Sequence, residues 1–132
     1  MGITEKINAI RSGVPALLVG DLSSIMNISR ESLIDSLGLS RTTINRKAQH
    51  KQALSREESE RVIGIQSLIG PVQSMVDMDN APDFDAAKWL ACWLTEPLPA
   101  LAGKAPASYM DTVEGQKYIG NLLNMVQSGA YA

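Results

Sequence analysis

The stretch LIDSLGLSRTTINRK, residues 33–47, contains the pattern that decides the fold of the first half of this chain. Ile34 and Leu37 lie on one apolar face, and Gly38 follows where a left-handed residue ends a helix. Ser40 is suited to cap a second helix, whose outer face is polar. The pattern predicts two short helices joined by a glycine turn, an arrangement with which many proteins read DNA.

The second helix of this motif carries the predicted DNA contacts. Its N-terminal residues face base edges if the helix enters a major groove, and Arg and Asn suit bidentate hydrogen bonds to guanine and adenine. Cations further along are expected to touch phosphates, which position a protein without specifying sequence. The base-edge candidates are Arg41, Thr42, Thr43, Asn45 and Arg46, and the phosphate candidates are Lys47, Lys51 and Arg56. The alternative is an ordinary helical hairpin with a solvated basic face.

Charge is distributed unevenly between this motif and the rest of the chain. The 132 residues have a formal net charge of −2. Residues 36–56, however, contain five cations and no acid, while the remainder holds seven basic residues against fourteen acidic ones. An acidic chain with one basic patch is the footprint of a protein that meets phosphates with a single face.

The composition predicts a helical binding protein. Hydrophobic residues make up 45% of the chain but aromatic residues only 5%, so the core must rest on aliphatic side chains that favour helices. The one cysteine, Cys92, excludes an intrachain disulfide, fits a reducing cytoplasm and is expected to be a buried core thiol. With a single histidine, His50, we expect no metal site. No cofactor motif, catalytic spacing or membrane-spanning apolar run is visible, which predicts a cytoplasmic protein that is not an enzyme.

Apolar spacing predicts helices throughout and no strands. A weak helical turn is expected near residues 3–10, then a helix over 15–26 with a proline in its first turn. The two helices of the motif follow, and Ser29 is suited to cap the first of them. A capping box, Ser55 with Glu58, opens a long helix, which Gly70 and Pro71 should kink or break. Further helices are expected over residues 84–95, with both tryptophans on one side, and 112–129, with Thr112 as cap. The proline-rich stretch between them, residues 96–106, is apolar enough to form an ordered loop.

A more specific pattern lies in the second half. WLTEPLPALAGKAP, residues 93–106, followed by TVEGQKYIGNLL from Thr112, resembles the toxin-binding domain of the Xre/ParS/MbcA antitoxins. The matching residues are Trp93, Leu94, Pro97, Pro99, Ala100, Leu101, Gly103, Pro106, Glu114 and Gly115. The resemblance extends upstream through the helix-turn-helix, from about residue 29 to 129, and departs at Lys104 and Ala105, where Arg and Thr are common.

This resemblance implies an all-α antitoxin of a type II toxin-antitoxin system in two domains. Residues 1–61 would form an Xre/Cro-like helix-turn-helix domain, and residues 62–132 a helical domain for toxin binding and oligomerisation. The partner would be a RES-domain toxin, similar to ADP-ribosyl-transferring folds, which consumes NAD and whose active site the antitoxin blocks. The first domain would bind operator DNA and repress the shared operon, as a homodimer or a larger hetero-oligomer with the toxin.

The candidate toxin-binding residues lie in the proline-rich loop and in the tail QSGAYA. A pocket for NAD must hold a pyrophosphate with basic residues, so a segment ending in a carboxylate is suited to plug it. The candidates are Leu98, Lys104, Gln127, Ser128, Gly129, Ala130, Tyr131 and Ala132. The alternative is a stand-alone dimeric helix-turn-helix repressor with no toxin partner, whose second half dimerises or senses a signal.

Overall fold

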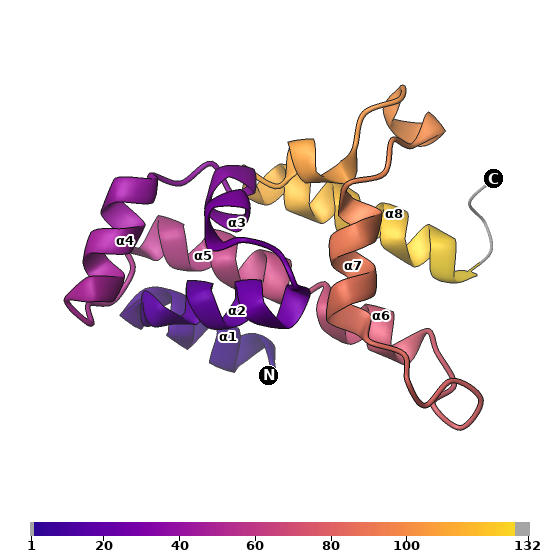
Figure 1. Ribbon diagram of the computed structural model, residues 1–132, viewed down its shortest axis with the longest axis horizontal. Coiled ribbons are helices and arrows are strands. Elements are labelled where there is room, and N and C mark those ends of the chain that lie inside the picture. Colours follow the sequence, from indigo (N-terminus) through magenta and orange to yellow (C-terminus); the bar gives the residue numbers. More distant parts are fainter. Residues whose placement is uncertain (1, 129–132) are drawn as a thin grey trace.

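The computed structural model describes residues 2–128, and over that range the protein is built from helices alone (Figure 1). The only extended pairing within it is a single bridge between Pro15 and Ala53. The expected all-α fold is confirmed. The elements in chain order are α1 (Ile3–Ser12), α2 (Leu17–Met26), α3 (Arg30–Ser36), α4 (Arg41–Gln49), α5 (Arg56–Gln66), α6 (Ile69–Ser74), α7 (Ala86–Leu94), the 3-10 turns η1 (Pro99–Leu101) and η2 (Pro106–Tyr109), and α8 (Val113–Ser128).

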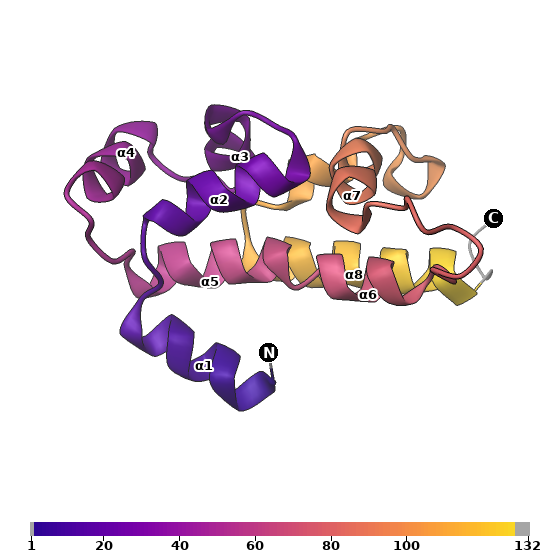
Figure 2. The ribbon, with the colours of Figure 1, turned by 60° about the horizontal axis from the view of Figure 1, so that its bottom comes forward.

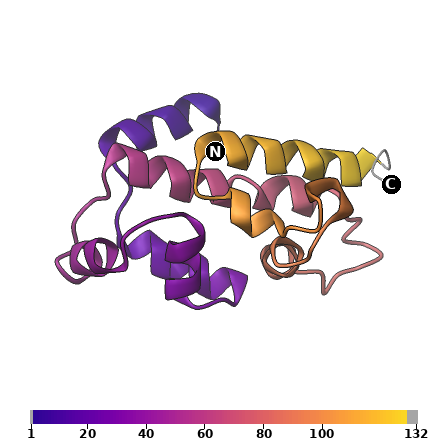
Figure 3. The ribbon, with the colours of Figure 1, turned by 90° about the horizontal axis from the view of Figure 1, so that it is seen from above.

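The helices are arranged along one long axis. Helices α5, α6 and α8 form a row, with α2, α3 and α7 over one side of it and α1 against α5 on the other (Figure 2). Seen from above, α1 and α8 lie along the same edge of the molecule (Figure 3). Helix α4 lies at one end of the long axis, and α8 ends towards the other (Figure 1). The two halves of the chain therefore present different ends to solvent.

Side-chain caps explain where five of the helices begin. At each cap a side-chain oxygen accepts a backbone N–H from the first turn, which satisfies a donor that has no partner within the helix. The caps at α3, α4, α5 and α8 were predicted from the sequence, including the capping box of α5, whereas the cap at α7 was not. The capping residues are Ser29, Ser40, Ser55, Asp85 and Thr112.

The start of the chain differs from the prediction in two ways. Helix α1 is a full ten-residue helix, where only a weak helical turn was expected. It packs along α5, and this tertiary contact stabilises a helix with modest apolar character. Pro15 precedes α2 instead of lying in its first turn, because Val14 and Ala16 hydrogen-bond to Leu54 and Gln52 and hold the intervening residue extended.

The expected break in the long helix is confirmed, but it lies upstream of the proline. Helix α5 ends at Gln66, and α6 begins at Ile69 with Pro71 in its first turn. Proline has no N–H to donate to the carbonyl four residues earlier, which here belongs to Ser67, and its ring clashes with that carbonyl. The helix is therefore interrupted one turn before the residue that causes the interruption.

One core connects the two halves of the chain. Fully buried side chains from both halves, including Ile44 and Leu123, belong to the same cluster. The boundary expected after residue 61 falls inside α5, which takes part in this core. The Nε2 of Gln116 in α8 donates to the Arg61 carbonyl at 3.0 Å and to the Met110 carbonyl at 3.1 Å. Gly64 leaves room for this amide, because a Cβ there would lie 1.8 Å from its oxygen.

Helix α7 places its two tryptophans together, as expected. The rings of Trp89 and Trp93 are stacked with centroids 6.1 Å apart, and Trp93 is buried. The prediction that Cys92 is a buried thiol is wrong, since its side chain is exposed. Cys92 lies on the same side of α7 as the exposed residues Lys88 and Thr95, which are four residues before it and three after it.

Candidate functional site

The glycine turn between α3 and α4 has the predicted geometry. Gly38 has φ +67°, a left-handed conformation that costs little for glycine. It also lies against the second half of the chain, because a Cβ at this position would be 2.9 Å from the Asp111 Cβ. Ser40 then caps α4 by accepting the Thr43 N–H at 3.2 Å. The turn thus fixes α4 relative to α3 and brings the two halves together.

The exposed face of α4 is narrower than the sequence suggested. Ile44 and Ala48 are buried in the core. Thr43, Asn45 and Lys47 are half-buried, and the Asn45 side-chain oxygen is buried with no hydrogen-bond partner among residues 2–128. The α4 residues exposed to solvent are Arg41, Thr42, Arg46 and Gln49.

Gln49 is exposed on this face of α4, although its sequence position was not among the predicted DNA contacts. It lies three residues after Arg46 and seven after Thr42, so the three share one stripe of the helix. Its amide is suited to a bidentate contact with adenine, a role that the sequence analysis gave to Asn45. Counting helical spacing from Thr42 would have identified it.

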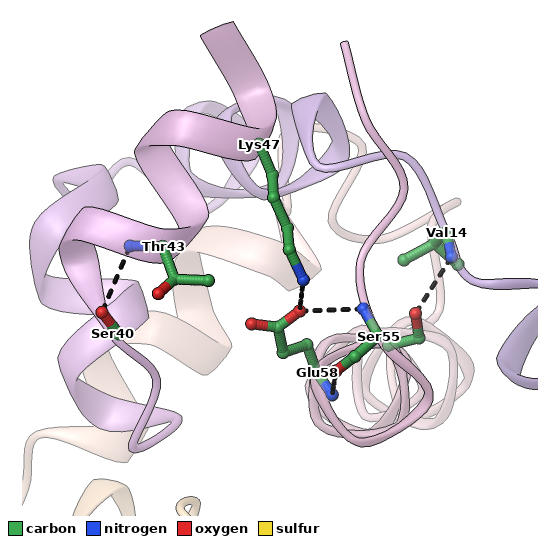
Figure 4. A network of polar contacts seen from close by, with 7 residues as sticks. Val14, Ser40, Thr43, Lys47, Ser55 and Glu58 are labelled. Atoms are coloured by element: carbon green, nitrogen blue, oxygen red, sulfur yellow. Dashed lines mark hydrogen bonds and ion pairs between the residues drawn. The ribbon is translucent and has the colours of Figure 1, made fainter. Parts of the chain in front are cut away.

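Lys47 is held inside the protein rather than offered to a phosphate. Its Nζ lies 2.6 Å from the Glu58 Oε1, and the two side chains are only 19% and 14% exposed (Figure 4). The same carboxylate oxygen accepts the Ser55 N–H at 2.8 Å, so the ion pair is joined to the capping box of α5. Lys47 therefore fixes α4 to the start of α5, and its ammonium is paired with a carboxylate.

The Glu58 carboxylate is stabilised in its charged form by this network. Burial raises its pKa, but hydrogen bonds from Lys47 and Ser55 outweigh that effect and hold the pKa below its ordinary value. Next to the network, the Val14 N–H donates to the Ser59 Oγ at 3.0 Å, which joins α5 to the segment before α2 (Figure 4). The first turn of α5 therefore binds both α4, through Lys47, and the segment before α2, through Val14.

A second cation of residues 36–56, Arg41, is paired with an acid, Asp35. The Arg41 Nε donates to the Asp35 Oδ1 at 2.9 Å, and the Arg41 Nη2 donates to the Oδ2. This hydrogen bond lowers the pKa of Asp35. Two of the five cations between residues 36 and 56 are therefore paired with acids just outside that window. Within residues 2–128, Arg46, Lys51 and Arg56 form no ion pair.

The proline-rich loop of the second half is ordered by its own backbone. The Leu98 N–H donates to the Lys104 carbonyl at 3.1 Å, and the Gly103 N–H donates to the Leu98 carbonyl at 2.9 Å. Leu98 is only 8% exposed and Leu101 only 3%. Leu98, a predicted toxin contact, therefore anchors the loop in the core, whereas the Lys104 side chain is exposed.

The predicted tail contacts lie at the limit of the described structure. Gln127 and Ser128 belong to the last turn of α8. Gly129, Ala130, Tyr131 and Ala132 lie outside the described residues. Among residues 2–128, no cluster of three or more His, Cys, Asp or Glu side chains is placed to hold a metal ion, and no helix has the length and apolar character needed to cross a membrane.

The fold and its exposed faces define a helix-turn-helix protein with a second helical domain that carries an ordered loop. Two family models match the chain: the antitoxin Xre-like helix-turn-helix domain over residues 5–67 and the antitoxin Xre/MbcA/ParS C-terminal toxin-binding domain over residues 84–129. A curated relative from Sphingobium sp. (strain YBL2), named Prs ADP-ribosylating antitoxin, is 40% identical over 129 residues, which cover 97% of this chain and 81% of that protein. The chain belongs to the Xre/MbcA/ParS antitoxins, which are binding proteins rather than enzymes.

Proposed function

We propose that this antitoxin neutralises a RES-domain toxin that consumes NAD, by blocking its active site, and that it represses its own operon by binding operator DNA. The toxin-binding domain match supports a toxin partner. The name of the Sphingobium relative refers to ADP-ribosylation, a chemistry that takes its ADP-ribose from NAD. The RES assignment extends that chemistry to the partner of this chain.

The observation that carries this proposal is that the exposed residues of α4 and the end of α8 lie at opposite ends of the molecule. Helix α4, with its exposed residues Arg41, Thr42, Arg46 and Gln49, lies at one end of the long axis, and α8 ends towards the other (Figure 1). A protein built in this way can present α4 to DNA and its second domain to a protein partner. We assign base reading to Arg41, Thr42, Arg46 and Gln49.

Two further cations complete the proposed DNA interface. Lys51 follows α4 in a left-handed conformation, with φ 54°, and its side chain is exposed. Arg56 begins α5 and is exposed as well. Neither is paired with an acid in the described part of the chain, so both are available to phosphates.

The toxin-binding face is proposed to include Lys104 and residues 127–132. The loop that carries Lys104 is held by backbone hydrogen bonds and by the buried Leu98, so this cation is presented from a fixed position. Residues 129–132 follow α8 in the sequence and are proposed to enter the NAD pocket. In the assembled complex the antitoxin is proposed to be a homodimer or part of a larger hetero-oligomer.

The proposal is tested by co-expressing the chain with a RES-domain protein from the same operon. We expect the two to co-purify, and the purified chain to shift DNA from upstream of the operon. Deleting residues 128–132 should restore NAD loss while leaving DNA binding intact. If no toxin co-purifies and NAD loss is unaffected while DNA binding persists, the protein is instead a stand-alone repressor.

A further inference from the structure

Arg41 and Asp35 form a two-point contact across the glycine turn. The Arg41 Nε donates to one carboxylate oxygen at 2.9 Å, and its Nη2 donates to the other. Two parallel hydrogen bonds fix the plane of a guanidinium as well as its position. The side chains remain 56% and 51% exposed, so the pair lies on the surface beside the proposed reading face.

The contact leaves one edge of the guanidinium free. Arginine has five N–H donors, and this pair uses one on Nε and one on Nη2. Both donors on Nη1 and the second donor on Nη2 make no hydrogen bond with residues 2–128. With the Nε–Nη2 edge occupied by Asp35, the free Nη1–Nη2 edge still has two parallel donors, which match the O6 and N7 acceptors of guanine.

Neither stability nor phosphate attraction explains the presence of the acid. An exposed ion pair contributes little to folding. A carboxylate at a DNA interface also repels phosphates and cancels the charge of Arg41, so the neutral pair is a poor phosphate contact. The remaining benefit of Asp35 is that it orients the Arg41 side chain. A free arginine loses much rotamer entropy when it binds DNA, whereas an arginine already held by a carboxylate has lost that entropy before binding.

We propose that Asp35 is a specificity-determining residue of the DNA interface, which holds the Arg41 guanidinium so that its Nη1–Nη2 edge meets a guanine. This inference rests on the proposed operator binding. Asp35 is a positioning residue, since it acts through Arg41 and not on the base itself.

Glu31 provides a matched control. It is an acid of the same helix, α3, and forms no ion pair within residues 2–128. Glu31→Gln removes the same charge as Asp35→Asn but leaves the two hydrogen bonds to Arg41 intact. A difference between these two variants therefore reports on orientation and not on net charge.

The test is selection of DNA by the full chain from a library of randomised duplexes, followed by affinity measurements on the selected site. Arg41→Ala should lose the preference for guanine at one position, and Asp35→Asn should lose about tenfold of the same preference. Binding of Asp35→Asn to unrelated DNA should rise slightly, because a negative charge is gone. Glu31→Gln should keep the guanine preference. Thermal unfolding is measured for each variant and should not change, since both members of the pair are about half exposed.

Three results would overturn the inference. Asp35→Asn could keep the wild-type guanine preference, it could bind the selected site more tightly than wild type, or Arg41→Ala could leave every base preference unchanged. Failure of the proposed operator binding would look different, since the wild-type chain itself would then select no sequence.

Discussion

The ion pair between Lys47 and Glu58 is predicted to hold α4 against the start of α5, and Lys47→Met tests this directly. Methionine keeps most of the aliphatic length but removes the ammonium, which leaves the Glu58 carboxylate without its partner at 14% exposure. A surface pair contributes at most about 1 kcal/mol and a broken buried pair costs about 3 to 5 kcal/mol. Because this pair lies between those limits, we expect the free energy of unfolding to fall by about 1 to 3 kcal/mol, measured by urea denaturation.

The pH dependence of this loss has a definite sign. Hydrogen bonds in the folded state lower the pKa of Glu58 below the unfolded value of about 4.5. The stabilisation is therefore complete above that pH and is lost as the pH falls through the lower, folded value. Wild type and Lys47→Met should differ most at neutral pH and converge in acid. The control is Lys88→Met, since Lys88 is 58% exposed and its nearest carboxylate oxygen is 4.0 Å away.

The same variant separates positioning from phosphate contact. If Lys47 only orients α4, Lys47→Met weakens operator binding but leaves the dependence of affinity on salt almost unchanged. A lost phosphate contact instead lowers the slope of log affinity against log salt by about one. If Lys47→Met left the free energy of unfolding unchanged and lowered this slope by about one, Lys47 would be a phosphate contact and not a residue that positions α4.

Three other predictions concern single side chains. Arg46→Ala should cost about 1 to 3 kcal/mol of operator affinity and relax one base preference. Lys51→Ala should instead weaken binding to all DNA sequences alike and reduce the dependence of affinity on salt, and gel-shift titrations at several salt concentrations distinguish the two effects. Unchanged affinity for both variants would show that α4 and Lys51 do not form the DNA interface. Trp93→Ala should destabilise the fold by about 3 to 5 kcal/mol because the ring is 6% exposed, while Cys92→Ser should leave the thermal midpoint nearly unchanged. Gly64→Ala should destabilise by about 1 to 3 kcal/mol in the same assay, since its Cβ would lie 1.8 Å from a buried amide oxygen, and a neutral result would show that the amide moves freely.

Local signals predicted most of the helices, because their causes lie within a few residues of each other. Ser29, Ser40 and Ser55 each cap a helix through a residue three positions later. Gly38 ends α3 through its own backbone conformation. Such features can be identified from sequence since they depend on neighbours along the chain.

The features that the sequence did not reveal depend on contacts between distant residues. Arg41 and Lys47 lie in a segment without acids, residues 36–56. Asp35, just before this segment, pairs with Arg41, and Glu58, just after it, pairs with Lys47. A count of charges along the chain cannot show this. The formation of a complete α1 likewise depends on its packing against α5, which apolar spacing alone did not indicate.

The sequence did not separate the buried residues of the proline-rich loop from the exposed ones, for a similar reason. The resemblance identified the loop, but Leu98 turned out to anchor that loop in the core, while Lys104 is the exposed member. A motif marks the residues that a domain needs without separating those that hold the fold from those that meet a partner. In this loop, the burial of Leu98 and the exposure of Lys104 distinguish the two kinds of residue.

The most direct test of the proposed function is the rate at which a RES-domain toxin from the same operon consumes NAD as this chain is added. We predict that the rate falls to zero at a fixed molar ratio of chain to toxin, and that Arg46→Ala inhibits as well as wild type because it lies on the DNA-reading face. An NAD consumption rate that is unchanged in excess chain would contradict the proposal.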